Sequence, residues 1–224
     1  MKNIALLIVF VSLITSLLAS GNTDELREIY NRFAEKYDEN REIFDMSKII
    51  FDFNKYSGIQ KGRLLDLGCG AGSMFTEYYL SKGWEILGVD LSEKMLELSQ
   101  KNYPQMKTII GDMTEIDFDN DSFDVIISVY SLFHIQKEKH EALFQNIYKW
   151  LTPNGKVLFT YAGVEYTGSE TFSGYIEFMG ENMFYSHLSQ DELLMTLEKL
   201  NFKNIDIKKR DIGGETFLWV SMTK

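Results

Sequence analysis

The sequence contains one cysteine, two prolines and three histidines among 224 residues. A single cysteine excludes both an intrachain disulfide and a metal site built from several thiolates, and we predict no metal. Basic residues are also few, 23 against 33 acidic ones, which gives a net charge of -10. Because nucleic-acid binding requires clustered lysine and arginine, nucleic acid is not an expected partner.

Charged residues are missing from the N-terminal stretch between Lys2 and Asp24, where an apolar run covers residues 4–19. This run is marginal for a membrane span of ~20 residues, and small residues follow it where a signal peptidase would cut. We expect residues 1–22 to be a hydrophobic leader, either a signal peptide or a membrane anchor; the alternative is a buried helix. Three locations stay open: a membrane-associated domain facing the cytoplasm, a cytoplasmic protein, and an exported one.

From Thr23 onward, helical and strand patterns alternate. Helices are expected over 23–44, 72–83, 92–103, 137–151 and 189–202, with Ser92 and Ser189 as N-caps. Strands are expected over 62–68, 84–90, 106–112, 122–133, 156–162, 203–212 and 215–224. This alternation predicts one α/β domain, 23–224, with a mostly parallel sheet covered by helices on both faces.

Two segments depart from the alternation. The last two expected strands are separated only by a short turn with two glycines, so they should pair antiparallel at the edge of the sheet. Residues 162–188 show no clear element, and loops this long in a compact domain are usually functional. We therefore interpret 162–188 as a lid or substrate segment.

The stretch "RLLDLGCGAGSMF" places Asp66 and Gly68 at the end of the first expected strand and Gly70 and Gly72 directly after it. Glycines allow close backbone approach, and the start of a helix offers free amide groups to an anion. In open parallel sheets, ligands bind at the carboxyl ends of the strands. The spacing D-x-G-x-G-x-G differs from the dinucleotide and phosphate-loop motifs, but it still predicts a cofactor with an anionic group.

Acidic residues also end the next two expected strands: Asp90 in "GVDLS" and Asp112, followed by Met113, in "IIGDM". "FDVIISVYSLFHI" then supplies the fourth strand and the loop after it. In this order, the motifs resemble the class I S-adenosylmethionine-dependent methyltransferase family, over about residues 28–224. The resemblance implies a Rossmann-like, doubly wound and mostly parallel seven-stranded sheet with an antiparallel last strand.

The resemblance also implies the cofactor S-adenosyl-L-methionine and the residues that bind it. The three glycines would pack against its methionine part, and Asp66 would orient their loop. Asp90, with Leu91 beside it, would bind the ribose, and Asp112 with Met113 would contact the adenine. Ser128 would lie near the transferred group. Tyr30 and Tyr37, on a first helix like the one that closes over the cofactor in small-molecule members, are secondary candidates.

His134 and His187 are the candidate general bases, each with a structural role as the alternative. His134 follows the fourth strand, whereas His187 lies in the segment before the last helix; His140 is expected to be exposed on a helix. Three tyrosines are candidate substrate-binding residues: Tyr130, Tyr161 and Tyr185. The first two end strands, and the third lies in the 162–188 segment.

The sequence therefore predicts in-line transfer of a methyl group to a small-molecule acceptor, because a sulfonium donor needs mainly alignment and exclusion of water. A non-catalytic binding protein of the same fold is one alternative. A nicotinamide-dependent oxidoreductase is another, although the glycine spacing disfavours it. The acceptor, the use of a general base and the oligomeric state are not readable from the sequence.

Overall fold

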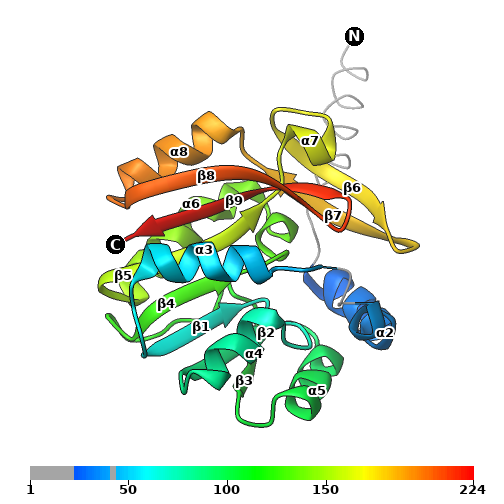
Figure 1. Cartoon of the computed structure of the whole chain (residues 1–224). Helices are drawn as coiled ribbons and strands as arrows, with labels where there is room; N and C mark the ends of the chain where they lie inside the picture. The colour runs from blue at the N-terminus through cyan, green and yellow to red at the C-terminus, as the bar shows by residue number, and fades with distance from the viewer. Residues whose placement is uncertain (1–22, 41–43) are drawn as a thin grey trace.

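A computed structural model describes residues 23–40 and 44–224 and shows a three-layer α/β arrangement (Figure 1). The leader predicted over 1–22 lies outside the described residues, so membrane association through 4–19 stays a prediction. Within the described ranges, no helix is both long and apolar enough to cross a bilayer.

The central sheet has seven strands in the order β3-β2-β1-β4-β5-β9-β8. The strands are β1 (Arg63–Leu67), β2 (Glu85–Asp90), β3 (Lys107–Ile110), β4 (Phe123–Ser128), β5 (Leu151–Tyr161), β8 (Lys203–Ile212) and β9 (Glu215–Thr223). The first five are mutually parallel, and β9 runs antiparallel to both β5 and β8. The predicted fold class and the antiparallel terminal hairpin are confirmed.

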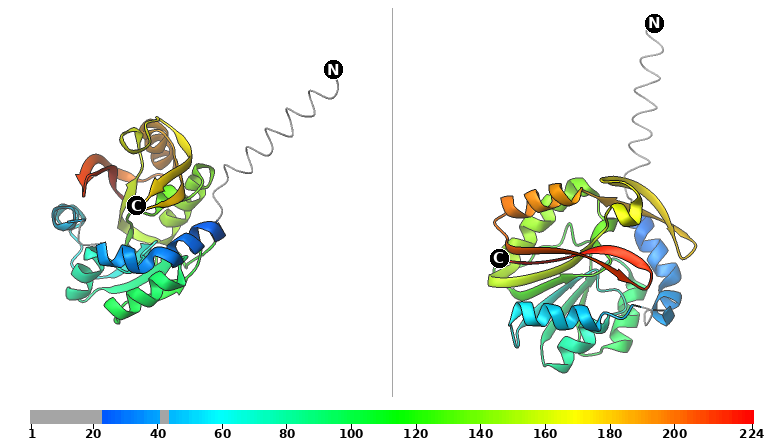
Figure 2. Two further views of the ribbon diagram at one scale, coloured as in Figure 1. Left: turned by 90° about the vertical axis from the view of Figure 1, so that its right-hand side faces the viewer. Right: turned by 45° about the horizontal axis from the view of Figure 1, so that its top comes forward.

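Alternate residues of the central strands face opposite layers of helices. Leu64 packs on the side of α3 (Ser47–Ser57), α4 (Met74–Ser81) and α5 (Glu93–Asn102), whereas Leu65 packs on the side of α6 (His140–Trp150) and α8 (Gln190–Lys199). Figure 2 shows the sheet between these two layers. Because both faces are covered, the central strands are continuously apolar rather than alternating, as in "FDVIIS".

The predicted caps are present. Ser92 accepts a hydrogen bond from the amide of Met95 at the start of α5. Ser189 forms a capping box with Glu192: each side chain accepts a bond from the other residue's backbone amide. Such boxes satisfy two otherwise unpaired amides at a helix start, so the local sequence alone fixes where these helices begin.

Two expectations about elements were wrong. Residues 162–188 are not an irregular loop: they form the short helix α7 (Val164–Thr167) and a hairpin of β6 (Phe172–Phe178) with β7 (Glu181–His187). Helix α3 was not predicted, and the first helix, α2 (Thr23–Asn40), ends earlier than the pattern suggested. The hairpin was missed because its strands carry glycine and polar residues and depend on tertiary packing.

Helix α2 and the β6–β7 hairpin lie together at the carboxyl end of the sheet (Figures 1 and 2). Ile29 and Phe33 of α2 pack with Met183 and Tyr185 of β7 and with Phe133 in one buried cluster. These two elements, distant in sequence, therefore form a common cover over the strand ends.

Candidate active site

The loop after β1 is held against the end of β2 by backbone hydrogen bonds. The amides of Gly68 and Cys69 both donate to the carbonyl of Val89, at 2.8 and 3.0 Å. The Cys69 side chain is buried, and burial raises the pKa of its thiol well above its usual value. A thiol held protonated in this way is a poor nucleophile, so Cys69 acts as a small packing residue.

Glycine is required in this loop for steric reasons. Gly68, Gly70 and Gly72 have φ values of 75°, 51° and 83°, which residues with a side chain rarely adopt. A Cβ at Gly68 would lie 2.4 Å from the Cβ of Ser131, and one at Gly72 would lie 2.4 Å from the ring of Tyr103. At Gly70, nothing approaches closer than 3.9 Å, and this residue borders a cavity.

Asp90 ends β2 and connects the glycine loop to helix α5. Its carboxylate accepts a hydrogen bond from the amide of Gly70 at 2.8 Å and another from the amide of Ser92 at 2.9 Å. Burial raises the pKa of Asp90 above its ordinary value, and these backbone bonds oppose that rise. Each oxygen keeps a free lone pair, so the carboxylate can still accept bonds from a ligand's hydroxyl groups.

Asp66, in the middle of the buried strand β1, has a different environment. Its side chain is 3% exposed and borders the same cavity, yet within the described residues its carboxylate has no hydrogen-bond or ion-pair partner. Burial, with a smaller contribution from the charge of Asp90, raises the pKa of Asp66 to about 7. A buried acceptor without a partner is costly, so this carboxylate is suited to a donor group on a ligand.

Asp112, after β3, is fixed by two threonines. One oxygen accepts from the amide and the hydroxyl of Thr114, both at 2.8 Å, and the other accepts from the hydroxyl of Thr23 at 3.2 Å. Thr23 begins helix α2, so the N-terminal cover is tied directly to this strand end.

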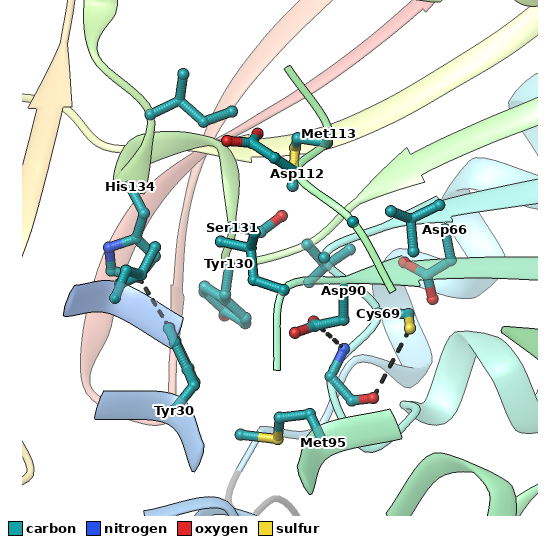
Figure 3. A pocket seen from close by; sticks show the side chains of 18 of the residues that line it. Tyr30, Asp66, Cys69, Asp90, Met95, Asp112, Met113, Tyr130, Ser131 and His134 are labelled. Carbon is teal, nitrogen blue, oxygen red and sulfur yellow. Dashed lines mark hydrogen bonds between the residues drawn. The ribbon is translucent and has the colours of Figure 1, made fainter. Parts of the chain in front are cut away.

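These groups surround one cavity of about 1210 Å³, including its open mouth. Figure 3 shows Asp66, Cys69 and Asp90 on one side of it and Tyr30 and His134 on the other. All predicted cofactor-binding residues except Ser128 line it: Asp66, Gly68, Gly70, Gly72, Asp90, Leu91, Asp112 and Met113. The mixed polar and apolar lining suits a nucleoside joined to an amino acid.

His134 contacts two elements of the cover through its two ring nitrogens. Nδ1 lies 2.8 Å from the carbonyl of Phe184 in β7, and Nε2 lies 2.9 Å from the hydroxyl of Tyr30 in α2. Because a carbonyl only accepts, Nδ1 carries the proton and Nε2 accepts from the tyrosine hydroxyl. Burial lowers the pKa of His134 to about 4, so the ring is neutral near pH 7.

A second, smaller space of about 340 Å³, including its open mouth, adjoins the first and shares Tyr30, Tyr37, Tyr130 and His134 with it. We call it the aromatic chamber. In the part of the chain that the structure describes, its lining consists of aromatic rings, His134 and one carboxylate. The aromatic residues are Tyr30, Tyr37, Phe44, Tyr130, Phe133, Tyr166, Phe178, Tyr185 and Phe217, and the carboxylate is that of Glu215.

Two polar groups of the aromatic chamber have no partner among the described residues. The hydroxyl of Tyr130 is buried without a hydrogen bond, and the half-buried carboxylate of Glu215 forms neither a hydrogen bond nor an ion pair. Tyr130 also has a φ of 56°, an unusual conformation for a bulky residue. Such strain and unpaired polar groups are concentrated at functional sites.

The remaining predicted residues do not line the larger cavity. Ser128 is buried beneath the cavity, where its hydroxyl donates to the carbonyl of Leu67. His187 is fully buried against Thr167 and the carbonyl of Leu188, and it lines neither space. Tyr161 is also fully buried and lines neither space, whereas Tyr185 borders the aromatic chamber.

The expectation that His140 is exposed was wrong: the side chain is 1% exposed. Its Nε2 lies 2.9 Å from the carbonyl of Ile135, and its Nδ1 lies 2.7 Å from the hydroxyl of Tyr161, which accepts from the amide of Leu188. This histidine therefore braces the loop carrying His134 against the end of β7. The sequence pattern of the helix did not predict the burial of His140, because the elements that pack against the first turn of α6 decide which of its residues are buried.

Sequence reasoning also missed Thr23, Ser131 and Glu215. Ser131 lines the larger cavity beside Gly68, and Glu215 begins β9 directly after the turn. The signal that could have identified Glu215 is its position: in an antiparallel last strand, the first residues lie at the carboxyl edge of the parallel strands.

Comparison with known proteins agrees with this geometry. Residues 64–155 match the family model described as a methyltransferase domain. The chain is 34% identical over 128 residues to phosphoethanolamine N-methyltransferase 3 of Arabidopsis thaliana, an alignment covering 54% of this chain and 25% of the relative. The chain thus spans about a quarter of the length of that relative.

Solved structures show the same fold at low sequence identity. A 1,6-didemethyltoxoflavin-N1-methyltransferase of Burkholderia thailandensis superposes with a TM-score of 0.67 at 18% identity, covering 89% of this chain and 87% of that one. A phosphoethanolamine N-methyltransferase 2 of Haemonchus contortus superposes with a TM-score of 0.68 at 19% identity, covering 88% and 60%. Both of those structures contain S-adenosylhomocysteine.

Proposed function

We propose that this chain, which carries a class I S-adenosylmethionine-dependent methyltransferase domain, transfers a methyl group from S-adenosyl-L-methionine to a small-molecule acceptor. The observation that supports this most is the single cavity bordered by the glycine loop, Asp66, Asp90 and Asp112 and joined to a separate aromatic chamber. A donor pocket and an acceptor pocket that share a wall are what group transfer requires.

The residues fit this donor. Gly70 leaves open space beside the backbone, and Asp66 has an unpartnered carboxylate that an ammonium group would complete. Asp90 would accept from the ribose hydroxyls, and Asp112 with Met113 would contact the adenine. Leu91 and Met113 supply apolar surface to the same cavity. We assign Ser128 a supporting role, because its hydroxyl bonds Leu67 beneath the cavity.

When bound, the donor supplies an activated methyl group on a positively charged sulfonium. The chain's own contribution is then to align the acceptor and exclude water. The cover formed by α2 and the β6–β7 hairpin serves this purpose, since it packs over the strand ends through Ile29, Phe33 and Met183.

We propose His134 as the group that accepts a proton when the acceptor is protonated. Its neutral ring presents the Nε2 lone pair toward Tyr30, so a proton would reach it through the Tyr30 hydroxyl or after that hydrogen bond opens. For His187, the buried contacts with Thr167 and Leu188 support the structural alternative instead. For the acceptor, Tyr130 and Tyr185 are proposed contacts, whereas Tyr161 supports them from beneath.

The experiment is calorimetry of the full chain with S-adenosylhomocysteine, followed by transfer of a labelled methyl group to a metabolite extract. Binding with labelling of a small molecule supports the proposal. Binding without any labelling favours the alternative of a non-catalytic protein of this fold. Absence of binding by the folded chain contradicts the proposal, and binding of NADH in its place would favour the oxidoreductase alternative.

A further inference from the structure

The aromatic chamber differs from the donor pocket in its chemistry. Among the described residues, nearly all of its wall is the face or edge of an aromatic ring, and Glu215 supplies the one carboxylate. Tyr166 and Phe217 pack in a tilted arrangement with centroids 4.5 Å apart, and Phe133 stacks on both Phe217 and Tyr185 at 5.0 Å. These contacts fix the orientations of the rings that form the wall of the chamber.

Within the described residues, no lysine or arginine lines the chamber. The three basic residues of the neighbouring helix α2 are engaged outside it. Arg27 pairs with Asp24 at 2.7 Å and Arg32 with Glu181 at 2.9 Å, and Lys36 donates to the carbonyl of Met179 at 3.0 Å. A phosphate group is recognised by cationic side chains and amide donors. In the chamber, such a group would instead face the carboxylate of Glu215, which has no ion-pair partner among the described residues.

The same features are favourable for a cation. Aromatic faces attract an ammonium or methylated ammonium group, most strongly where water is excluded. Glu215 supplies a carboxylate with no partner, and the buried Tyr130 hydroxyl supplies an unused polar atom in the same wall. Each would gain an interaction from an amine, and neither is satisfied by the protein itself.

We propose that the acceptor bound in the aromatic chamber is an organic amine or methylated ammonium without a phosphate group, recognised by the ring faces and by Glu215. This proposal deepens the proposed function and rests on it, because it takes the ligand of the chamber to be the methyl acceptor. It separates the chain from the relatives named for phosphoethanolamine, whose named substrate carries a phosphate.

The test uses the full chain with three probes: choline, its uncharged carbon analogue 3,3-dimethylbutan-1-ol, and phosphocholine. Affinities are measured by calorimetry, with and without saturating S-adenosylhomocysteine. We expect choline to bind about tenfold more tightly than the uncharged analogue, a difference of one power of ten in Kd that cation–π and carboxylate contacts can supply. Phosphocholine should bind more weakly than choline.

Variants identify the site. Glu215→Gln should remove the preference for choline over its uncharged analogue, because it removes the carboxylate. Tyr166→Leu removes one aromatic face and should weaken choline binding through loss of a cation–π contact. Glu177→Gln is the matched control: it makes the same change in charge at an exposed position of β6. It should leave all three affinities unchanged.

Several results would overturn the assignment: phosphocholine binding more tightly than choline, equal binding of choline and its uncharged analogue, no binding of any probe, or a preference unchanged in Glu215→Gln. Failure of the proposed function is read separately, from the binding of S-adenosylhomocysteine alone. If that ligand fails to bind while choline is still preferred, the chamber assignment holds and the methyl-donor assignment does not.

Discussion

The hydroxyl of Tyr30 lies 2.9 Å from Nε2 of His134, although the two residues are 104 positions apart. Tyr30 belongs to the covering helix α2, and His134 ends the short 3₁₀ helix η2 (Leu132–His134) after β4. The bond therefore joins the cover to the floor of the site, at the wall shared by the donor pocket and the aromatic chamber.

Removing this bond should slow the reaction more than it weakens donor binding. In Tyr30→Phe, the ring remains and only the hydroxyl is lost, so we expect turnover to fall about tenfold or more, as for lost acid–base assistance. Affinity for S-adenosylhomocysteine should change by less than about threefold. Tyr175→Phe, which removes an exposed hydroxyl bonded to Glu25, is the control and should retain full turnover. Equal turnover in the two variants would contradict a role for the Tyr30–His134 pair.

Asp90→Ala should weaken binding of S-adenosylhomocysteine without unfolding the domain. The change removes the proposed ribose contact and the acceptor that fixes the amides of Gly70 and Ser92. Lost hydrogen bonds to a charged group are worth about 1.5–3 kcal/mol each, so the dissociation constant should rise by about tenfold to a hundredfold. Calorimetry measures the affinity and circular dichroism checks the fold. Asp119→Ala, at an exposed aspartate, is the control, and an unchanged affinity in Asp90→Ala would refute the ribose assignment.

Stability should depend on pH through Asp66. Its pKa in the folded protein is raised to about 7, so folding is favoured while the carboxyl is protonated, and this contribution is lost as pH rises from the unfolded pKa toward 7. Asp66→Asn removes the ionisation. The stability of this variant relative to wild type should therefore increase between pH 4.5 and pH 7.5, by at most about 4 kcal/mol. Urea unfolding of the ligand-free protein at both pH values measures it, and a constant difference would show that Asp66 does not titrate in this range.

The buried hydroxyl of Tyr161 should matter for stability. It joins Nδ1 of His140 to the amide of Leu188, so Tyr161→Phe leaves a buried ring nitrogen and a partly buried amide without these partners. We expect a loss of about 2–4 kcal/mol in the free energy of unfolding. Tyr148→Phe, at a partly buried ring on α6 that packs edge-on against Phe202, should cost no more than about 0.5 kcal/mol. Similar losses in the two variants would contradict the bracing role of Tyr161.

Gly72→Ala tests the steric argument for the glycine loop. Its added Cβ would meet the ring of Tyr103 at 2.4 Å, and the backbone is left-handed. Gly168 has a similar φ of 75°, but a Cβ added there would meet no other atom. Gly168→Ala therefore measures the backbone strain alone, about 1 kcal/mol, without a steric clash. We expect Gly72→Ala to be the more destabilising of the two in thermal unfolding and to bind S-adenosylhomocysteine more weakly. Equal effects of both substitutions would mean that the contact with Tyr103 relaxes at no cost.

The sequence by itself determined the order of elements, the glycine loop and the acidic residues that lie within β1, end β2 and follow β3. These features are local: a buried parallel strand is a short apolar run, a serine cap begins a helix, and glycine marks a left-handed turn. Because parallel strands end at one edge, their last residues had to meet there, and Asp66, Asp90 and Asp112 line one cavity.

The aromatic chamber was decided only by the tertiary structure. Tyr30, Tyr185 and Glu215 come from α2, β7 and β9, and no periodicity along the chain relates them. The same holds for the burial of His140 and for the position of His187 outside both spaces. Burial and pairing of such side chains depend on which elements pack together. That is a property of long-range contacts, which one-dimensional patterns do not contain.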